Sequence, residues 1–151
     1  MIQKIISGAQ TGADRAGIDA AIESGIDYGG WLPHGRKAED GIVPREYTKL
    51  QELNGGDYPA RTKQNVIDSD GTVIFGYGRL TTGSALTRKF ARQYNKPYLH
   101  IDLDIIKEPV PVIKDWIVDQ DIKILNVAGR KASKAPGIYD KVKNIIRQVL
   151  E

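Results

Sequence analysis

The sequence contains no cysteine, few aromatic residues and no long hydrophobic run. Without cysteine, the chain forms no disulfide, offers no thiolate to a metal and has no cysteine nucleophile. No apolar run approaches the roughly 18 residues that a membrane-spanning helix needs. The first residues also lack the apolar core of a secretory signal. We therefore expect a cytoplasmic protein without a membrane partner.

Positive charge is only slightly in excess, with 22 Lys and Arg against 19 Asp and Glu, and a net charge of +3. Proteins that bind nucleic acid usually concentrate basic residues in blocks and interleave them with aromatics. Here the basic residues are scattered, and aromatics make up 7% of the chain. We expect no nucleic-acid partner, although the charge favours the approach of small anions.

The pattern of apolar residues predicts one α/β domain over residues 1–151. The chain is 40% hydrophobic and 27% charged, values typical of a globular protein. Five short apolar runs alternate with helical patterns, as in a mostly parallel central sheet covered by helices on both faces. We expect a three-layer sandwich, with strands near 4–7, 28–32, 72–75, 98–101 and 123–127.

Two further features concern the segments between these strands. Residues 33–57 show no clear periodicity, which is typical of a functional or mobile loop. Leu86, Phe90 and Tyr94 follow one another at four-residue spacing, which predicts a core-facing helical stripe. The closing helix, about 136–150, is expected to bury its own apolar face.

Glycine-rich segments follow three of the predicted strands, at 8–15, 76–84 and 126–129. In open parallel sheets, ligands bind beyond the carboxyl ends of the strands. If the strand order is flavodoxin-like, the first and third strands are neighbours and their loops face one crevice. Backbone N–H groups at the start of a helix are a natural seat for phosphate. The alternative is that these glycines only reverse the chain.

The candidate phosphate contacts come from these segments. Their spacing matches neither the dinucleotide motif G-x-G-x-x-G nor a P-loop, so NAD binding and ATP hydrolysis are not expected. A cradle of backbone donors and hydroxyls remains. Its predicted members are Gly8, Gln10, Thr11, Gly12, Gly76, Thr82, Gly83, Ser84, Asn126 and Gly129.

Charged residues near these loops are candidates for binding the rest of a ligand. Asp14 and Arg15 stand in the first predicted helical turn, and Arg36, Glu39 and Asp40 lie in the long irregular segment. Arginine grips phosphate with two parallel hydrogen bonds, and a carboxylate could bind ring nitrogens or act as a general acid or base. Alternatively, Asp14 only complements the helix dipole and the loop charges are solvated.

Metal binding by the protein itself is not expected. The two histidines, His34 and His100, stand too far apart in sequence to form a recognisable metal pair. No serine occupies a G-x-S-x-G motif, so a hydrolase triad has no support.

Several long segments resemble the molybdenum cofactor carrier family. They are 7–15 (SGAQTGADR), 30–41 (GWLPHGRKAEDG), 65–72 (NVIDSDGT), 83–87 (GSALT), 126–129 (NVAG) and 135–139 (APGIY). The resemblance implies a Rossmann-like domain that carries or stores molybdopterin-type cofactor and commonly forms homo-oligomers. This cofactor holds its metal through the dithiolene of its own pterin, so absence of cysteine is no obstacle.

The resemblance also implies a relation to the lysine-decarboxylase-like phosphoribohydrolases. Those relatives carry P-G-G-x-G-T-x-x-E at the second glycine loop, whereas residues 78–87 read GRLTTGSALT. The missing glutamate argues against N-glycosidic hydrolysis. We expect a binding protein for a small phosphorylated ligand, a pterin, rather than an enzyme. The alternative is a protein that binds or hydrolyses a nucleotide or nucleotide derivative.

Overall fold

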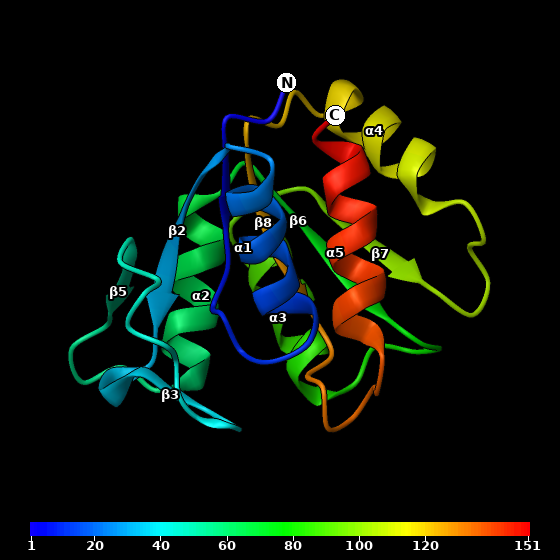
Figure 1. Ribbon diagram of the computed structural model, residues 1–151. Coiled ribbons are helices and arrows are strands. Elements are labelled where there is room, and N and C mark those ends of the chain that lie inside the picture. Colours follow the sequence, from blue (N-terminus) through cyan, green and yellow to red (C-terminus); the bar gives the residue numbers. More distant parts are fainter.

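The computed structural model describes residues 1–151 and contains a six-stranded parallel sheet with helices on both faces (Figure 1). The strand order is β5-β2-β1-β8-β6-β7, and a separate antiparallel hairpin pairs β3 with β4. This arrangement confirms the predicted α/β Rossmann-like sandwich. The elements are β1 (Lys4–Ile6), α1 (Ala13–Glu23), β2 (Asp27–Leu32), the 3-10 turn η1 (His34–Arg36), β3 (Lys37–Ala38), β4 (Gly41–Ile42), β5 (Leu50–Glu52), α2 (Tyr58–Asp68), β6 (Gly71–Gly76), α3 (Thr82–Gln93), β7 (Tyr98–Asp102), α4 (Pro109–Asp119), β8 (Ile124–Gly129) and α5 (Ile138–Val149).

The helices form the two outer layers. Helices α1 and α5 pack against each other in front of the sheet in Figure 1, with α4 beside α5, while α2 and α3 pack together behind it. Both chain termini lie at the upper edge of that view, opposite the loops that follow β1 and β8 (Figure 1). None of the helices has the length and apolar character needed to cross a membrane.

The flavodoxin-like strand order is wrong, because β8 lies between β1 and β6 and pairs with both. Its sequence suits the centre of a sheet, since Leu125 and Val127 are fully buried. Asn126 is buried between them, and its amide donates a hydrogen bond to Thr72 Oγ1 of β6 at 3.1 Å. The two glycine loops therefore flank the end of β8 instead of adjoining one another.

The irregular segment 33–57 contains more regular structure than its sequence indicates. It holds η1, the β3–β4 hairpin and β5, which extends the main sheet beyond β2. Each of these strands has only two or three residues, and Leu50 is their only buried residue. Hydrogen bonds to a neighbouring backbone segment define these strands. Their side chains therefore show no alternating apolar pattern that the sequence could reveal.

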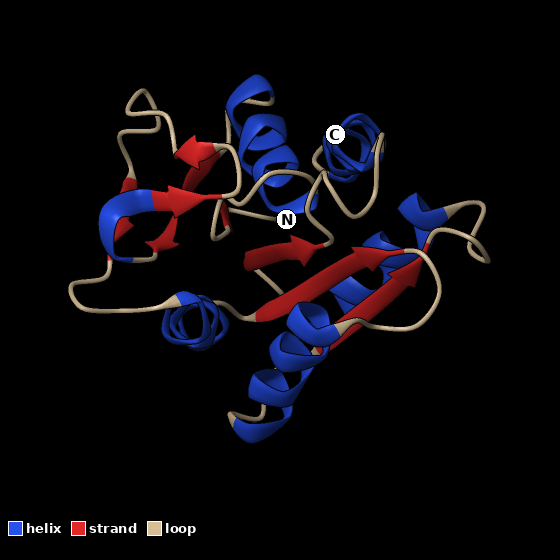
Figure 2. Cartoon of the chain, turned by 90° about the horizontal axis from the view of Figure 1, so that it is seen from below, coloured by secondary structure: helices blue, strands red, loops and turns tan.

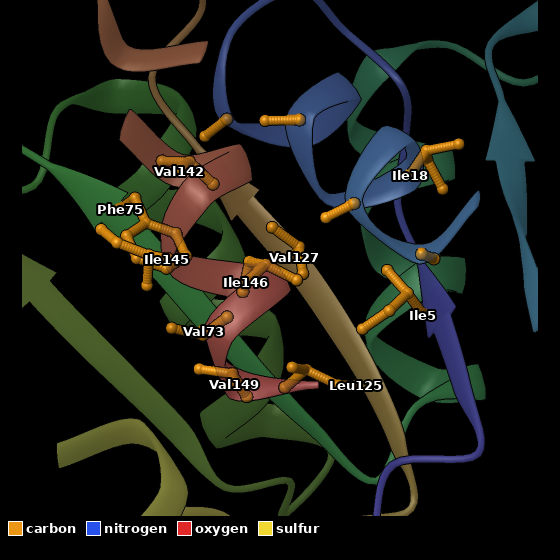
Figure 3. Close-up of a cluster of buried hydrophobic side chains, with 14 of the residues drawn as sticks. Ile5, Ile18, Val73, Phe75, Leu125, Val127, Val142, Ile145, Ile146 and Val149 are labelled. Atoms are coloured by element: carbon orange, nitrogen blue, oxygen red, sulfur yellow. The ribbon is translucent and has the colours of Figure 1, made fainter. Parts of the chain in front are cut away.

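The main core lies between the sheet and the layer formed by α1 and α5 (Figure 3). The predicted inner face of α5, formed by Ile138, Val142, Ile145 and Val149, is confirmed, because all four side chains are buried. The packed side chains labelled in Figure 3 are Ile5, Ile18, Val73, Phe75, Leu125, Val127, Val142, Ile145, Ile146 and Val149.

The predicted core stripe of α3 is wrong. The buried residues of this helix are the small side chains Ser84, Thr87 and Ala91, whereas Leu86, Phe90 and Tyr94 are only half-buried. Small side chains let the helix axis approach β6 and β8 closely, which moves the large ones to its flank. The flank that carries Tyr94 meets α2, where the Lys63 ammonium lies 5.8 Å from the Tyr94 ring centre.

Asp19 of α1 joins two distant segments, since its carboxylate accepts hydrogen bonds from Tyr47 (2.7 Å) and from Tyr139 of α5. Asp19→Ala should lower the free energy of unfolding by about 2 kcal/mol, because two half-buried phenols lose a charged acceptor. Burial and then the Asp19 carboxylate raise the pKa of both phenols. The stabilisation is therefore present at neutral pH and declines as pH rises past the usual tyrosine pKa of about 10.

Urea unfolding of Asp19→Ala beside Asp115→Ala checks this prediction. Asp115 is an exposed residue of α4 whose carboxylate makes no hydrogen bond or ion pair. Equal stability of the two variants would show that the Asp19 contacts contribute nothing.

Candidate functional site

A cavity of about 600 Å³ opens at the carboxyl edge of the sheet. Figure 2 views the molecule from the side of the loops that form it. The loops after β1 and β8, helix α2 and the start of α3 build its walls. The lining residues are Gly8, Gln10, Asp14, Tyr58, Pro59, Arg61, Thr62, Asn65, Thr81, Thr82, Gly83, Ser84, Leu86, Thr87, Asn126, Val127, Ala128, Gly129, Arg130, Lys131 and Lys134.

The cavity brings together part of the site predicted from the sequence. The predicted residues that line it are Gly8, Gln10, Asp14, Thr82, Gly83, Ser84, Asn126 and Gly129. The predicted residues that lie outside the lining are Thr11, Gly12, Arg15, Arg36, Glu39, Asp40 and Gly76. All three glycine-rich segments therefore contribute to one cavity, as their positions after parallel strands lead us to expect.

Arg61 of α2 lies directly over Gly8. A Cβ atom at Gly8 would lie 1.4 Å from Arg61 Nη1, so the missing side chain creates the space for the guanidinium. Arg61 Nη1 lies 3.2 Å from Asp14 Oδ2, and the side chains of this pair are only 11% and 10% exposed. Arg61 Nε is buried and has no hydrogen-bond partner. A buried donor without a partner is costly, so this guanidinium is suited to an anionic ligand.

Asp14 holds this arrangement in place from the first turn of α1. Its backbone carbonyl accepts a hydrogen bond from Ser7 Oγ at 2.8 Å, and Ser7 Oγ in turn accepts one from Ala9 N–H. Burial raises the pKa of the Asp14 carboxyl, while Arg61 beside it acts in the opposite direction. Asp14 contributes the only carboxylate of the lining.

The N-terminus of α3 forms the opposite wall. Thr81 precedes the helix, and its side chain does not cap it. The first N–H groups of an α-helix have no acceptor within the helix, and those of Thr82, Gly83 and Ser84 find none elsewhere in the chain. Nothing lies within 4 Å of a Cβ built on Gly83. This end of the helix is therefore open to the cavity and favours negative charge.

A cationic turn after β8, residues 130–134, supplies Arg130, Lys131 and Lys134. Arg130 Nη2 donates to the carbonyl of Tyr77 at 3.0 Å, which fixes the side chain beside the end of β6. With Arg61, the lining holds four cations and one carboxylate, so its formal charge is +3. No three His, Cys, Asp or Glu side chains gather where they could hold a metal ion.

The β3–β4 hairpin fastens two of the loops from outside the cavity. The Glu39 carboxylate accepts hydrogen bonds from the Thr11 and Ser133 hydroxyls and, at 3.1 Å, from Ser133 N–H. Thr11 Oγ1 also accepts a hydrogen bond from Ala132 N–H at 3.1 Å. Gln10 adds a further link, since its Oε1 accepts the N–H of Glu39 at 2.9 Å. The hairpin thus ties the first glycine loop to the cationic turn.

These contacts predict an acid-dependent stability. The hydrogen bonds from Ser133 and then Thr11 lower the pKa of Glu39 to about 2. A lowered pKa gives stability that is complete above the unfolded value, about 4.5, and is lost as pH falls towards 2. At neutral pH the free energy of unfolding of wild type should exceed that of Glu39→Gln by less than about 1 kcal/mol, because the carboxylate is exposed. This difference in stability should vanish in acid.

Thermal unfolding of both proteins between about pH 7 and about pH 2 measures that difference. Glu46→Gln, an exposed carboxylate without a partner, serves as the control. A wild-type advantage that persists at the acid end would contradict the role assigned to Glu39.

The other predicted residues outside the lining also have structural partners. Asp40 pairs with Arg15 at 2.6 Å, and Arg15 additionally donates to the carbonyl of Ala9. Arg36 donates to the carbonyls of Val43 and Pro44, so its guanidinium stabilises its own loop. These side chains are held by contacts outside the cavity lining.

Sequence reasoning missed Arg61 and the three cations of the turn. Arg61 stands in an ordinary amphipathic helix, and only the packing of α2 beside the first glycine loop brings it to the cavity. Lys131 and Lys134 follow the third glycine segment directly. Their nearness to 126–129 was a usable signal, because residues after a parallel strand lie at the ligand edge.

The fold defines an α/β protein of the Rossmann-like class, with a cavity beyond the carboxyl ends of its parallel sheet. The chain belongs to the circularly permutated YpsA SLOG family, whose sequence model matches residues 5–150.

A solved structure, that of a "putative molybdenum carrier protein" from Syntrophus aciditrophicus SB, is 52% identical to this chain, with a TM-score of 0.95. The similarity covers 99% of this chain and 96% of that one. A comparison with curated proteins found no significant match. The family and this neighbour confirm the resemblance identified from the sequence.

Proposed function

We propose that this protein binds and carries a phosphorylated pterin of the molybdenum-cofactor type, with the phosphate at Arg61 and the first glycine loop. The observation that supports this most directly is the position of Arg61. Its nearly buried side chain lies over Gly8 and pairs with Asp14, and its Nε has no hydrogen-bond partner. The open N-terminus of α3 supports the same ligand class, because it offers free N–H groups to an anion.

The size and chemistry of the cavity fit such a cargo. Its volume of about 600 Å³ falls within the usual range for small-molecule sites, about 300–1,000 Å³. Hydroxyl and amide side chains such as Thr62, Ser84 and Asn126 provide hydrogen bonds for a polar ring system. The name of the 52% identical neighbour supports a molybdenum-related cargo. The metal would travel on the pterin dithiolene, since the lining contains no thiolate or imidazole.

Mass spectrometry of small molecules released from purified protein tests the proposal. We expect a phosphorylated pterin from wild type, and much less of it from the Arg61→Ala variant. Recovery of a nucleotide without any pterin would overturn the proposed cargo.

A second candidate is a protein that acts on a nucleotide derivative, and Asp14 is the observation that favours it. A buried carboxyl with a raised pKa is suited to general acid catalysis. Glu39 and Asp40 are poorer candidates, because they lie outside the cavity lining. Turnover in a panel of nucleoside monophosphates, lost in Asp14→Asn, would support catalysis. No turnover across the panel would count against it.

A homo-oligomeric state and a cytoplasmic location stay predictions. Sedimentation of the purified protein measures the first of these.

A further inference from the structure

The positive charge of the cavity exceeds what one phosphate requires. Asp14 pairs with Arg61, so these two charges offset one another. The cationic turn contributes three more charges to the lining, from Arg130, Lys131 and Lys134. Glu39 offsets part of the charge of Lys131 from outside the cavity. A phosphate monoester carries about −1.5 to −2 at neutral pH, so one such group at Arg61 would leave about +1 to +1.5 of the formal +3 of the lining without a counter-charge.

The cationic turn and Arg61 are also held by different parts of the fold. Arg61 comes from α2 and lies against Gly8, whereas Arg130 is fastened to the Tyr77 carbonyl after β6. Lys131 and Lys134 flank Ser133, whose N–H and hydroxyl are bound by Glu39. Two sets of cations, each fixed by its own side-chain contacts, therefore face one cavity of about 600 Å³.

We propose that the cavity takes an organic diphosphate, with one phosphate at Arg61 and the second at the cationic turn. Glu39 is the positioning residue of the second subsite, because it holds Ser133 between the two lysines and links this turn to Thr11. The inference rests on the proposed function, since it divides the same cavity into two phosphate subsites. A pterin diphosphate ester and a nucleoside diphosphate share this chemistry.

Calorimetric titration without metal, using AMP, ADP and pyrophosphate as probes, tests the second subsite. ADP should bind wild type at least about tenfold more tightly than AMP, the effect expected for new hydrogen bonds between charged groups. In Lys131→Ala/Lys134→Ala this preference should fall to within about twofold, because the affinity for ADP falls more than the affinity for AMP. The control is Lys89→Ala/Lys114→Ala, which removes two exposed charges outside the cavity.

Glu39→Gln separates positioning from charge. It leaves every cation of the lining in place, so AMP affinity should hold while the preference for ADP declines. A merely structural role for Glu39 would lower the affinity for both nucleotides together. Circular dichroism spectra and melting temperatures of all variants check that each variant folds.

The outcomes distinguish this inference from the proposed function. Equal affinity for AMP and ADP in wild type would overturn the second subsite and leave the first intact. A preference for ADP that survives loss of both lysines would overturn its assignment to the turn. Failure of all three probes to bind would overturn the phosphate site itself. The mass of the released ligand distinguishes a pterin from a nucleotide source.

Discussion

Arg61→Ala should reduce the affinity for AMP and inorganic phosphate by about 100-fold. The guanidinium is fastened at Nη1 alone, which leaves Nε and Nη2 free for a two-pronged grip on phosphate. Each hydrogen bond between charged groups contributes about 1.5–3 kcal/mol, and about 1.4 kcal/mol is a factor of ten in affinity. Calorimetric titration of wild type and variant measures the ratio. A loss below threefold would show that phosphate does not bind at Arg61.

The same change also affects stability, and this effect depends on pH. Removing Arg61 leaves the buried Asp14 carboxylate without its counter-charge, which typically costs about 3–5 kcal/mol. Burial already raises the pKa of Asp14, and loss of Arg61 raises it further. The folded state then binds a proton more tightly than the unfolded state, so the variant should regain stability as pH falls from neutral towards the ordinary aspartate pKa of about 3.9. Asp14→Asn/Arg61→Met removes both charges and tests binding in a better-folded background.

Gly8→Ala tests the position of Arg61 without deleting a charge. The backbone of Gly8 does not have a positive φ, so alanine is tolerated there, but its methyl would occupy the place of Nη1. A flexible side chain can move away, so the protein should fold and bind AMP about tenfold more weakly, as expected for one lost charge-assisted contact. Gly76→Ala is the matched control, because its methyl would meet Arg130 only at 3.6 Å.

The fold followed from the sequence where local pattern and burial agree. Helix α5 is the clearest case, because it buries the regular apolar face formed by Val142, Ile145 and Val149. The position of β8 did not follow, because strand order depends on long-range pairing that no local pattern encodes. The strand β5 was missed for a related reason, since only Leu50 of its three residues is buried.

Part of the candidate site could also be predicted from the sequence, because it depends on where the strands end. Glycine segments after parallel strands must lie at one edge, so Gly8, Gly83 and Gly129 could be placed together in advance. The partner of a charged side chain is a tertiary property, however. Glu39 proves to bind Ser133, a residue 94 positions away, and Arg61 reaches Asp14 only through the packing of α2.

Gly12→Ala should destabilise the protein by at least about 3 kcal/mol, through a strained backbone and a steric clash. Gly12 has φ 81° and ψ −132°, a conformation that residues with a side chain rarely adopt. An added Cβ would lie 2.4 Å from the backbone oxygen of Arg130, and backbone cannot rotate away as a side chain can. The same Arg130 oxygen accepts a hydrogen bond from Ala13 N–H at 3.1 Å. Relieving the clash would break this bond, so the first glycine loop would separate from the cationic turn.

Gly137→Ala serves as a reference for a left-handed glycine that has no clash. Gly137 also precedes a helix and has φ 84°, but nothing lies within 4 Å of its added Cβ. It should lose only about 1–2 kcal/mol, the usual cost of a left-handed residue. Urea unfolding of both variants gives the difference, which combines the clash at the turn with the greater backbone strain at Gly12, where ψ is −132° against −6° at Gly137. Equal losses would show that the two loops separate without cost, and the cavity walls would then be independent of one another.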